Sequence, residues 1–170
     1  MKPVLSTEEV VRLEDIIERE GTSKAELMEL AGEFAANEVL KLNPDRVLVL
    51  VGFGNNGGDG WVAADILSHK GVVVDIHGNL RAPFSIWIPT VNECADCVVS
   101  IDVPSGLNAE TGVVDDDCIR AEHTVTMIAP KIGLYSADGP EYAGDLICGN
   151  LYDRLDEVID DVDHAAEIVE

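Results

Sequence analysis

The segment that most constrains the fold is a run of six residues, Arg46–Val51 (RVLVLV), followed directly by a glycine-rich stretch, Gly52–Gly60 (GFGNNGGDG). A continuous apolar run of mostly branched residues is typical of a strand buried on both faces of a parallel sheet. A helix is predicted from about Trp61 to Lys70, and a second strand over Val72–Ile76. This strand–loop–helix–strand unit predicts an α/β protein with an open, mostly parallel sheet covered by helices.

Two helices are predicted before this unit. Ser6 and Ser23 each stand three residues before a glutamate, which is the spacing of a capping box. Apolar residues then recur at helical spacing, until Gly21 ends the first helix and the second reaches about Lys41.

Three more strands are predicted after it. Residues 98–103 and 124–128 read as buried strands, and 144–148 as a short edge strand. The acidic segment 154–170 begins with helical spacing and is expected either to cover the fold or to fray. With 170 residues, the chain 1–170 is interpreted as a single domain.

The charge balance is strongly acidic. The chain has 33 Asp and Glu against 11 Lys and Arg, a formal net charge of -22. Such a surface repels phosphate backbones and anionic lipids, so nucleic acid and membranes are excluded as expected partners. The balance resembles that of proteins from salt-in halophiles, which suggests a halophilic, potassium-rich setting.

Two further features point to an intracellular protein. The sequence has no apolar run of membrane-spanning length and no apolar signal region at its start, so a cytoplasmic location is expected. The four cysteines are interpreted as free thiols, because the lone C-x-x-C of Cys94 and Cys97 has no second pair to complete a zinc site.

The glycine-rich stretch is the strongest functional signal. A loop after a parallel strand lies where α/β sheets bind ligands, and the amides at the next helix start favour an anion such as a pyrophosphate. A formal G-x-G-x-x-G match is weak, since Gly58-Asp59-Gly60 delays the helix. The spacing indicates a nucleotide or phosphate ligand; a simple glycine-rich turn is the alternative. Asp75 stands at the distance of a ribose-binding carboxylate.

Two charged residues follow the later strands. Asp102, in IDVPSG, is expected at a buried strand end, where partial desolvation suits proton transfer; capping of the turn is the alternative. Lys131 follows the strand over 124–128 and is a candidate for holding a phosphate or stabilising negative charge, with an ordinary surface lysine as the alternative. The histidines show no metal-ligand spacing.

The segments GFGNNGGDG, IDVPSGLN and TVTMIAPKIGL, in this order, resemble the YjeF N-terminal domain family, the NAD(P)H-hydrate epimerases. The resemblance covers residues from about 5 to 150. It implies a three-layer Rossmann-like fold with helices on both faces of the sheet. It also implies an enzyme, an isomerase that interconverts the two C6 epimers of hydrated NADH or NADPH.

The resemblance also implies the site residues. The hydrated dinucleotide would contact Asn55, Asn56, Gly57, Gly58 and Asp59, with Asp102 at its nicotinamide end. Asn56 and Ser105 would help to ligate a potassium ion. We further hypothesise that Asp102 gives and takes the proton of the reaction, with Lys131 tuning it or holding the ligand.

The implied partners are a small molecule, NADHX or NADPHX, and a separate NAD(P)H-hydrate dehydratase. A homodimer is also implied, because dimers are common in the family.

One part of the family pattern is missing. Members have a further strand ending in a V-D-A-x-x-G turn. Here residues 77–81 run directly into 82–84, and this stretch is similar only to the tail of the loop that follows that turn, so the deletion lies near residues 78–84. The turn's aspartate, a potassium ligand in the family, has no counterpart. Loss of an interior strand would leave its neighbours to re-pair or leave their edges open. An inactive nucleotide-binding or scaffold module of the same fold is therefore the alternative function.

Overall fold

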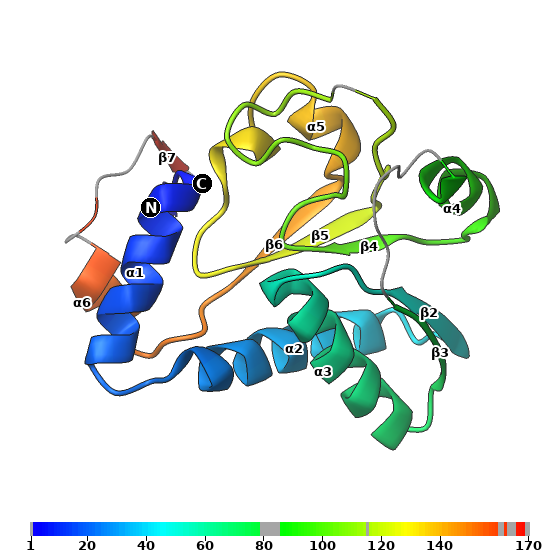
Figure 1. Cartoon of the computed structure of the whole chain (residues 1–170), viewed down its shortest axis with the longest axis horizontal. Helices are drawn as coiled ribbons and strands as arrows, with labels where there is room; N and C mark the ends of the chain where they lie inside the picture. Colours follow the sequence, from blue (N-terminus) through cyan, green and yellow to red (C-terminus); the bar gives the residue numbers. More distant parts are fainter. Residues whose placement is uncertain (1, 79–85, 115, 160–161, 163–165, 169–170) are drawn as a thin grey trace.

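The computed structural model describes residues 2–78, 86–114, 116–159, 162 and 166–168. Figure 1 shows the elements in chain order. They are β1 (Lys2–Val4), α1 (Thr7–Arg19), α2 (Lys24–Lys41), β2 (Arg46–Leu50), α3 (Asn55–His69), β3 (Val73–His77), α4 (Ile88–Cys94), β4 (Val99–Ile101), β5 (His123–Met127), the 3-10 helix η2 (Ile132–Leu134), α5 (Gly139–Tyr142), β6 (Asp145–Gly149), α6 (Leu155–Val158) and β7 (Ala166–Ile168).

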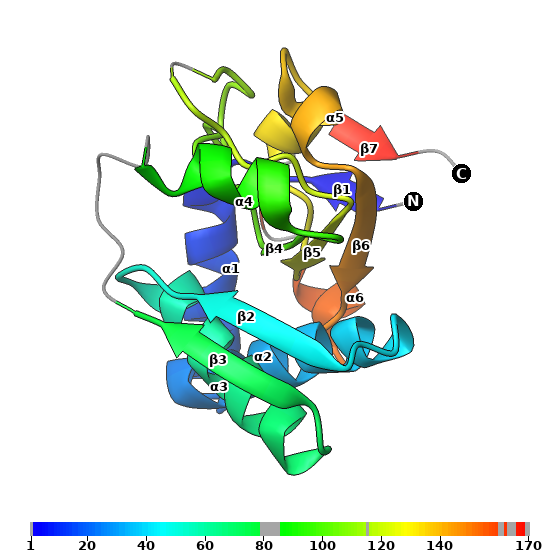
Figure 2. The ribbon, with the colours of Figure 1, turned by 90° about the vertical axis from the view of Figure 1, so that its right-hand side faces the viewer.

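The parallel strands form two sheets instead of one. β2 pairs with β3, and β4, β5 and β6 pair in that order, while β1 and β7 form a separate antiparallel pair. Figure 2 shows the β2–β3 pair and the β4–β5–β6 sheet as separate groups of strands. The α/β class with parallel strands and covering helices is confirmed. Within the described residues β2 and β4 each keep one unpaired edge, which is the outcome expected from loss of an interior strand.

Helices cover both faces of the β4–β5–β6 sheet. On one face, Val125 and Ile147 pack with the small residues Ala31 and Ala35 of α2. On the other face, Leu146 packs in a cluster that includes residues of η2 and α5. The layered arrangement predicted from the sequence is therefore present around β5, whose Thr124, Val125 and Thr126 are fully buried.

The prediction that β2 is buried on both faces is wrong. Val47 and Val74 pack towards α3, but Leu48 of β2 and Val73 of β3 are 59% and 57% exposed. At the carboxyl end of this second face, the ring centre of Trp87, which precedes α4, lies 4.7 Å from that of His77. An apolar run alone cannot reveal this exposure, because the sequence would be the same whether or not a second layer covers the strand.

The start of α3 also differs from the prediction. The helix begins at Asn55, inside the glycine-rich stretch, and not near Trp61. Its early glycines are used for close packing: a Cβ on Gly60 would lie 2.8 Å from the Val51 side chain. The two earlier helices begin as expected, with Ser6 accepting from the Glu9 amide and a reciprocal capping box between Ser23 and Glu26.

The acidic C-terminal segment contributes to the core where the structure describes it. Leu155 and Val158 of α6 are buried in a cluster with Leu13 and Ile17 of α1. This part of the segment covers the fold, whereas 160–161, 163–165 and 169–170 lie outside the described residues, as does most of the predicted deletion point at 78–84.

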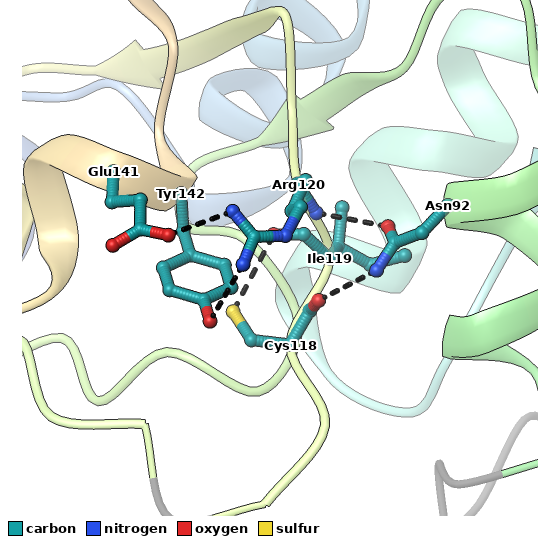
Figure 3. A network of polar contacts seen from close by, with 6 residues as sticks. All are labelled: Asn92, Cys118, Ile119, Arg120, Glu141 and Tyr142. Atoms are coloured by element: carbon teal, nitrogen blue, oxygen red, sulfur yellow. Dashed lines mark hydrogen bonds and ion pairs between the residues drawn. The ribbon is translucent and has the colours of Figure 1, made fainter.

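A polar network joins α4 and α5 to the segment that leads into β5 (Figure 3). The Asn92 amide donates to the carbonyl of Cys118 at 2.9 Å and its oxygen accepts from the Arg120 amide at 3.0 Å. The Arg120 guanidinium bonds Glu141 and lies 4.5 Å from the centre of the Tyr142 ring. Two short helices are thereby fixed to one extended segment.

Two expectations from composition can be compared with the structure. Cys94, Cys97 and Cys118 are free thiols, the first two exposed and the third buried. In the described parts of the chain, no helix has both the length and the apolar character needed to cross a membrane.

Candidate active site

The site residues come from three strand ends. The glycine-rich loop follows β2, Asp102 follows β4, and Lys131 comes after β5. Because all three strands point the same way within their parallel sheets, their carboxyl ends are the expected position for a ligand. The helix α3, which begins in the glycine-rich loop, also contacts β4, so the loop and Asp102 are close in space.

Asp102 and Lys131 form a buried ion pair. The Lys131 side chain is 5% exposed and that of Asp102 is 19% exposed, and the ammonium donates to Asp102 Oδ1. Thr126 Oγ1 lies 3.1 Å from the same carboxylate oxygen and donates to it. Lys131 is therefore not an ordinary surface lysine, and the Asp102 carboxylate bonds side chains of β5 and its following loop rather than capping its own turn.

Asp59 has the most perturbed acid–base behaviour in this part of the molecule. Its carboxyl group is buried in α3, and this burial, reinforced by the charges of Asp102 and Glu14, raises its pKa to about 7. The Lys131 ammonium acts in the opposite direction. A carboxyl group with such a pKa is both donor and acceptor of protons near neutral pH.

Glu14 of α1 is a third carboxyl group near the pair. Burial raises its pKa, while Lys131 and Lys24 oppose the rise. The site therefore places three carboxyl groups around one buried ammonium, which is an excess of acidic groups. Sequence reasoning missed Glu14, because it lies in an amphipathic helix of ordinary pattern and belongs to no motif.

The glycine-rich loop is shaped by close backbone contacts. A Cβ on Gly57 would lie 2.3 Å from the Gly52 carbonyl oxygen, and one on Gly58 would lie 2.4 Å from Met28 Sδ of α2. The first turn of α3 has no side-chain cap, and Asn55 and Asn56 are exposed there. Uncapped first-turn amides can donate to an anionic ligand.

The other predicted site residues are less closely joined. Ser105 is exposed in the turn after β4, and its carbonyl accepts from the Ile119 amide at 2.9 Å. No hydrogen bond connects Ser105 to Asn56 in the part of the chain that the structure describes. Their neutral oxygens are donors that fit a hard cation such as potassium, and the excess of carboxylates nearby favours a cation. The described residues contain no cluster of three or more His, Cys, Asp or Glu able to hold a metal.

Asp75 does not lie at the carboxyl edge. It is in the middle of β3, where its carboxylate accepts from Arg46 Nε at 2.6 Å across the exposed face of the β2–β3 pair. Arg46 opens β2, at the end opposite to the glycine-rich loop, so this carboxylate is held away from the site.

Comparison with known proteins identifies the family. Residues 24–81 and 73–133 match the family described as YjeF-related protein N-terminus. A bifunctional NAD(P)H-hydrate repair enzyme Nnr of Coxiella burnetii is 29% identical, over 89% of this chain and 42% of the relative. An NAD(P)H-hydrate epimerase of Weissella koreensis is 33% identical, over 74% of this chain and 80% of the relative.

A solved structure confirms the fold. The crystal structure of yeast ynu0, YNL200c, superposes with a TM-score of 0.67 over 78% of this chain and 83% of that chain, at 21% identity. The chain spans only about two fifths of the length of the bifunctional relatives that it matches, such as those of Coxiella burnetii and Dictyoglomus turgidum.

The alignments also confirm an internal deletion. The Coxiella burnetii alignment runs over 203 positions, yet 89% of 170 residues is only about 151 residues. About 50 positions of the relative therefore face gaps in this chain. The two stretches that match the family overlap at 73–81, which spans β3 and the residues directly after it. This is the point in the chain at which the structure changes from one parallel sheet to the other.

Proposed function

Since this chain belongs to the family described as YjeF-related protein N-terminus, we propose that it interconverts the two C6 epimers of hydrated NADH and NADPH. Relatives named NAD(P)H-hydrate epimerase and NAD(P)H-hydrate repair enzyme support this substrate. The observation that carries the proposal is the buried Asp102–Lys131 pair together with Asp59, whose pKa of about 7 suits proton transfer. The activity is that of an isomerase in metabolite repair.

The reaction breaks the bond between C6 and its hydroxyl oxygen and re-forms it on the opposite face of the ring. A proton added to the hydroxyl lets it leave as water with the bonding electrons, and the lone pair of the ring nitrogen stabilises the resulting cation. Water then adds to the other face and releases one proton. The proton given and the proton recovered balance, so the protein returns to its starting state.

Two side chains carry these proton transfers. Asp59 donates the first proton, because a pKa of about 7 leaves part of it protonated near neutral pH. Asp102, held by Lys131 and Thr126, accepts the proton from the adding water. The proton then passes back to Asp59. Asn55, Asn56 and the uncapped amides at the start of α3 bind the dinucleotide.

A potassium ion is part of this proposal. Asn56 and Ser105 would hold it through neutral oxygens, and it would supply positive charge near the phosphates of the dinucleotide. We place the reaction in a potassium-rich cytoplasm of a halophilic cell, with a separate dehydratase consuming one epimer. A homodimer remains a prediction, which sedimentation would test.

Turnover is the direct test. The chain is added, in high KCl, to an S-specific dehydratase that has exhausted its epimer from mixed NADHX. We expect NADH formation to resume and to be abolished by Asp102→Asn. Asp75→Asn is the matched control, since it removes a carboxylate that is paired on the sheet face, and it is expected to keep full activity.

The opposite result is equally clear. Folded protein that gives no acceleration over the spontaneous epimerisation rate would overturn the enzyme proposal. If such protein still binds NADH, the chain is a binding module without catalysis.

A further inference from the structure

Strands β4 and β5 both end in the same rare turn. Asp102 has φ 69° and sits between Ile101 and Val103, whose amide donates to the Ile101 carbonyl at 3.0 Å. One strand over, Ile128 has φ 66°, and the Ala129 amide donates to the Met127 carbonyl at 2.7 Å. A hydrogen bond across one residue with positive φ is the pattern of the strained, uncommon form of the γ-turn.

The turn at Ile128 is the more unusual of the two. Aspartate tolerates positive φ comparatively well, but a β-branched residue there is a genuine outlier. Such backbone strain persists only when the surroundings hold it, and it gathers at functional sites. Here the Ile128 side chain is buried in a core cluster that also includes Leu13 and Ile17 of α1 and residues of α6.

The turn at Ile128 directs one carbonyl group. The Met127 oxygen accepts from the Ala129 amide, which closes the turn, and also from Lys131 Nζ at 3.3 Å. The same ammonium donates to Asp102 Oδ1, so the turn and the ion pair share a hydrogen-bond network.

The backbone on each side of Lys131 is also fixed. The Leu5 amide donates to the Pro130 carbonyl at 3.0 Å, and the Ile132 amide donates to the Leu5 carbonyl at 3.1 Å. Because Leu5 holds the main chain around Lys131, only the side chain of Lys131 can still move. Its ammonium is held by hydrogen bonds to Asp102, Thr126 and the Met127 carbonyl.

We propose that Ile128 is a positioning residue for the proton transfer at Asp102. Its side chain is anchored against α1 and holds the strained turn, the turn holds the Met127 carbonyl against the Lys131 ammonium, and the ammonium holds the Asp102 carboxylate. This proposal rests on the proposed function and adds a residue that touches neither substrate nor reacting atoms.

Paired alanine variants test it. Ile128→Ala and Ile17→Ala remove the same atoms from the same core cluster, so the loss of packing is matched. We expect Ile128→Ala to lower kcat 10- to 100-fold with little change in KM, as for other small displacements of a catalytic group. Ile17→Ala is expected to change kcat less than about twofold, and Ile128→Val, which keeps a branched anchor, should restore most of the rate.

A second readout does not depend on turnover. The pKa of Asp59 is raised by burial and by the charges of Asp102 and Glu14 and is lowered by Lys131. If Ile128→Ala releases the ammonium, a carbon-13 carboxyl titration should show the Asp59 midpoint rising, with no change in Ile17→Ala. This titration stands even if the wild-type protein proves inactive. Equal effects of the two alanine variants, in the titration and in any measurable rate, would overturn the positioning role.

Discussion

A single carboxyl group, that of Asp59, links the acidity of this chain to its chemistry. Most of its acidic residues are exposed and remain charged in water, but Asp59 is buried between α3 and the strand ends. Burial and the neighbouring carboxylates raise its pKa to about 7, so ionisation of this group opposes folding.

The stability of the protein should therefore depend on pH through Asp59. A folded-state pKa above the unfolded value of 3.8 gives a stabilisation that is complete below about pH 4 and is lost as the pH rises through about 7. Asp59→Asn should remove this dependence and unfold at higher urea than the wild type at pH 8. The expected difference is on the order of a few kcal/mol, measured by urea unfolding at pH 5 and 8 in constant salt.

Asp65→Asn is the control for this prediction. Asp65 lies on the same helix with its side chain in solvent, and the His69 imidazole 3.4 Å from it is equally exposed, so its substitution should change the pH dependence little. A wild-type protein as stable at pH 8 as at pH 5 would contradict the raised pKa of Asp59.

The sequence identified some of these residues and not others. Asp102 and Lys131 could be found because each follows a recognisable strand, and strands in a parallel sheet bring their ends together. The behaviour of Asp59 and Glu14 could not be found, because a pKa depends on burial and on neighbours that are distant in sequence. The hydrogen bonds of Thr126 were hidden for the same reason.

At the scale of elements, the helix α3 shows how a loop and a helix are made from one glycine-rich stretch. Gly57 and Gly58 lie in its first turns and meet different neighbours. Gly57 faces the rigid backbone of Gly52, while Gly58 faces the flexible end of the Met28 side chain.

This difference predicts unequal effects of two alanine substitutions. Both Gly57→Ala and Gly58→Ala gain about 1 kcal/mol in helix propensity. We expect Gly57→Ala to be destabilised overall, because the clash with a carbonyl oxygen costs about 1–3 kcal/mol. Gly58→Ala should be close to neutral, because Met28 can move. Urea unfolding of the two variants measures the difference, and equal destabilisation would show that Met28 is as fixed as the backbone.

The sequence predicted the helices and strands more accurately where the signal comes from neighbouring residues than where it depends on tertiary contacts. The serine caps of α1 and α2 were found because capping depends on residues three apart. The start of α3 was placed too late, because glycines argue against a helix unless close packing requires them. The β1–β7 pair was not predicted, since it joins the two ends of the chain.

The whole molecule carries a net charge of -22, and its parallel strands are divided between two small sheets. Repulsion among like charges destabilises the compact state, and salt shortens its range from about 10 Å at 0.1 M to about 3 Å at 1 M. The two parallel sheets have only two and three strands, so each contributes little stability to offset this repulsion.

Salt is therefore expected to stabilise the protein. The urea midpoint should rise between 0.1 M and 1 M salt by a similar amount in NaCl and in choline chloride, because screening does not depend on the cation. KCl should give an additional increase if the proposed potassium site exists, and Asn56→Ala should remove only that increase. A midpoint that is unchanged or lower at 1 M salt would contradict a destabilising role for the surface charge.

The pairing of Leu5 with the backbone around Lys131 has a consequence for biosynthesis. Leu5 is made early, but its partners Pro130 and Ile132 emerge only after more than a hundred further residues. At a ribosomal rate of 5–20 residues per second, this delay is roughly 6–25 s. The segment around Leu5 must therefore wait for one that is made much later, and the backbone on each side of Lys131 is held only once both segments have been made.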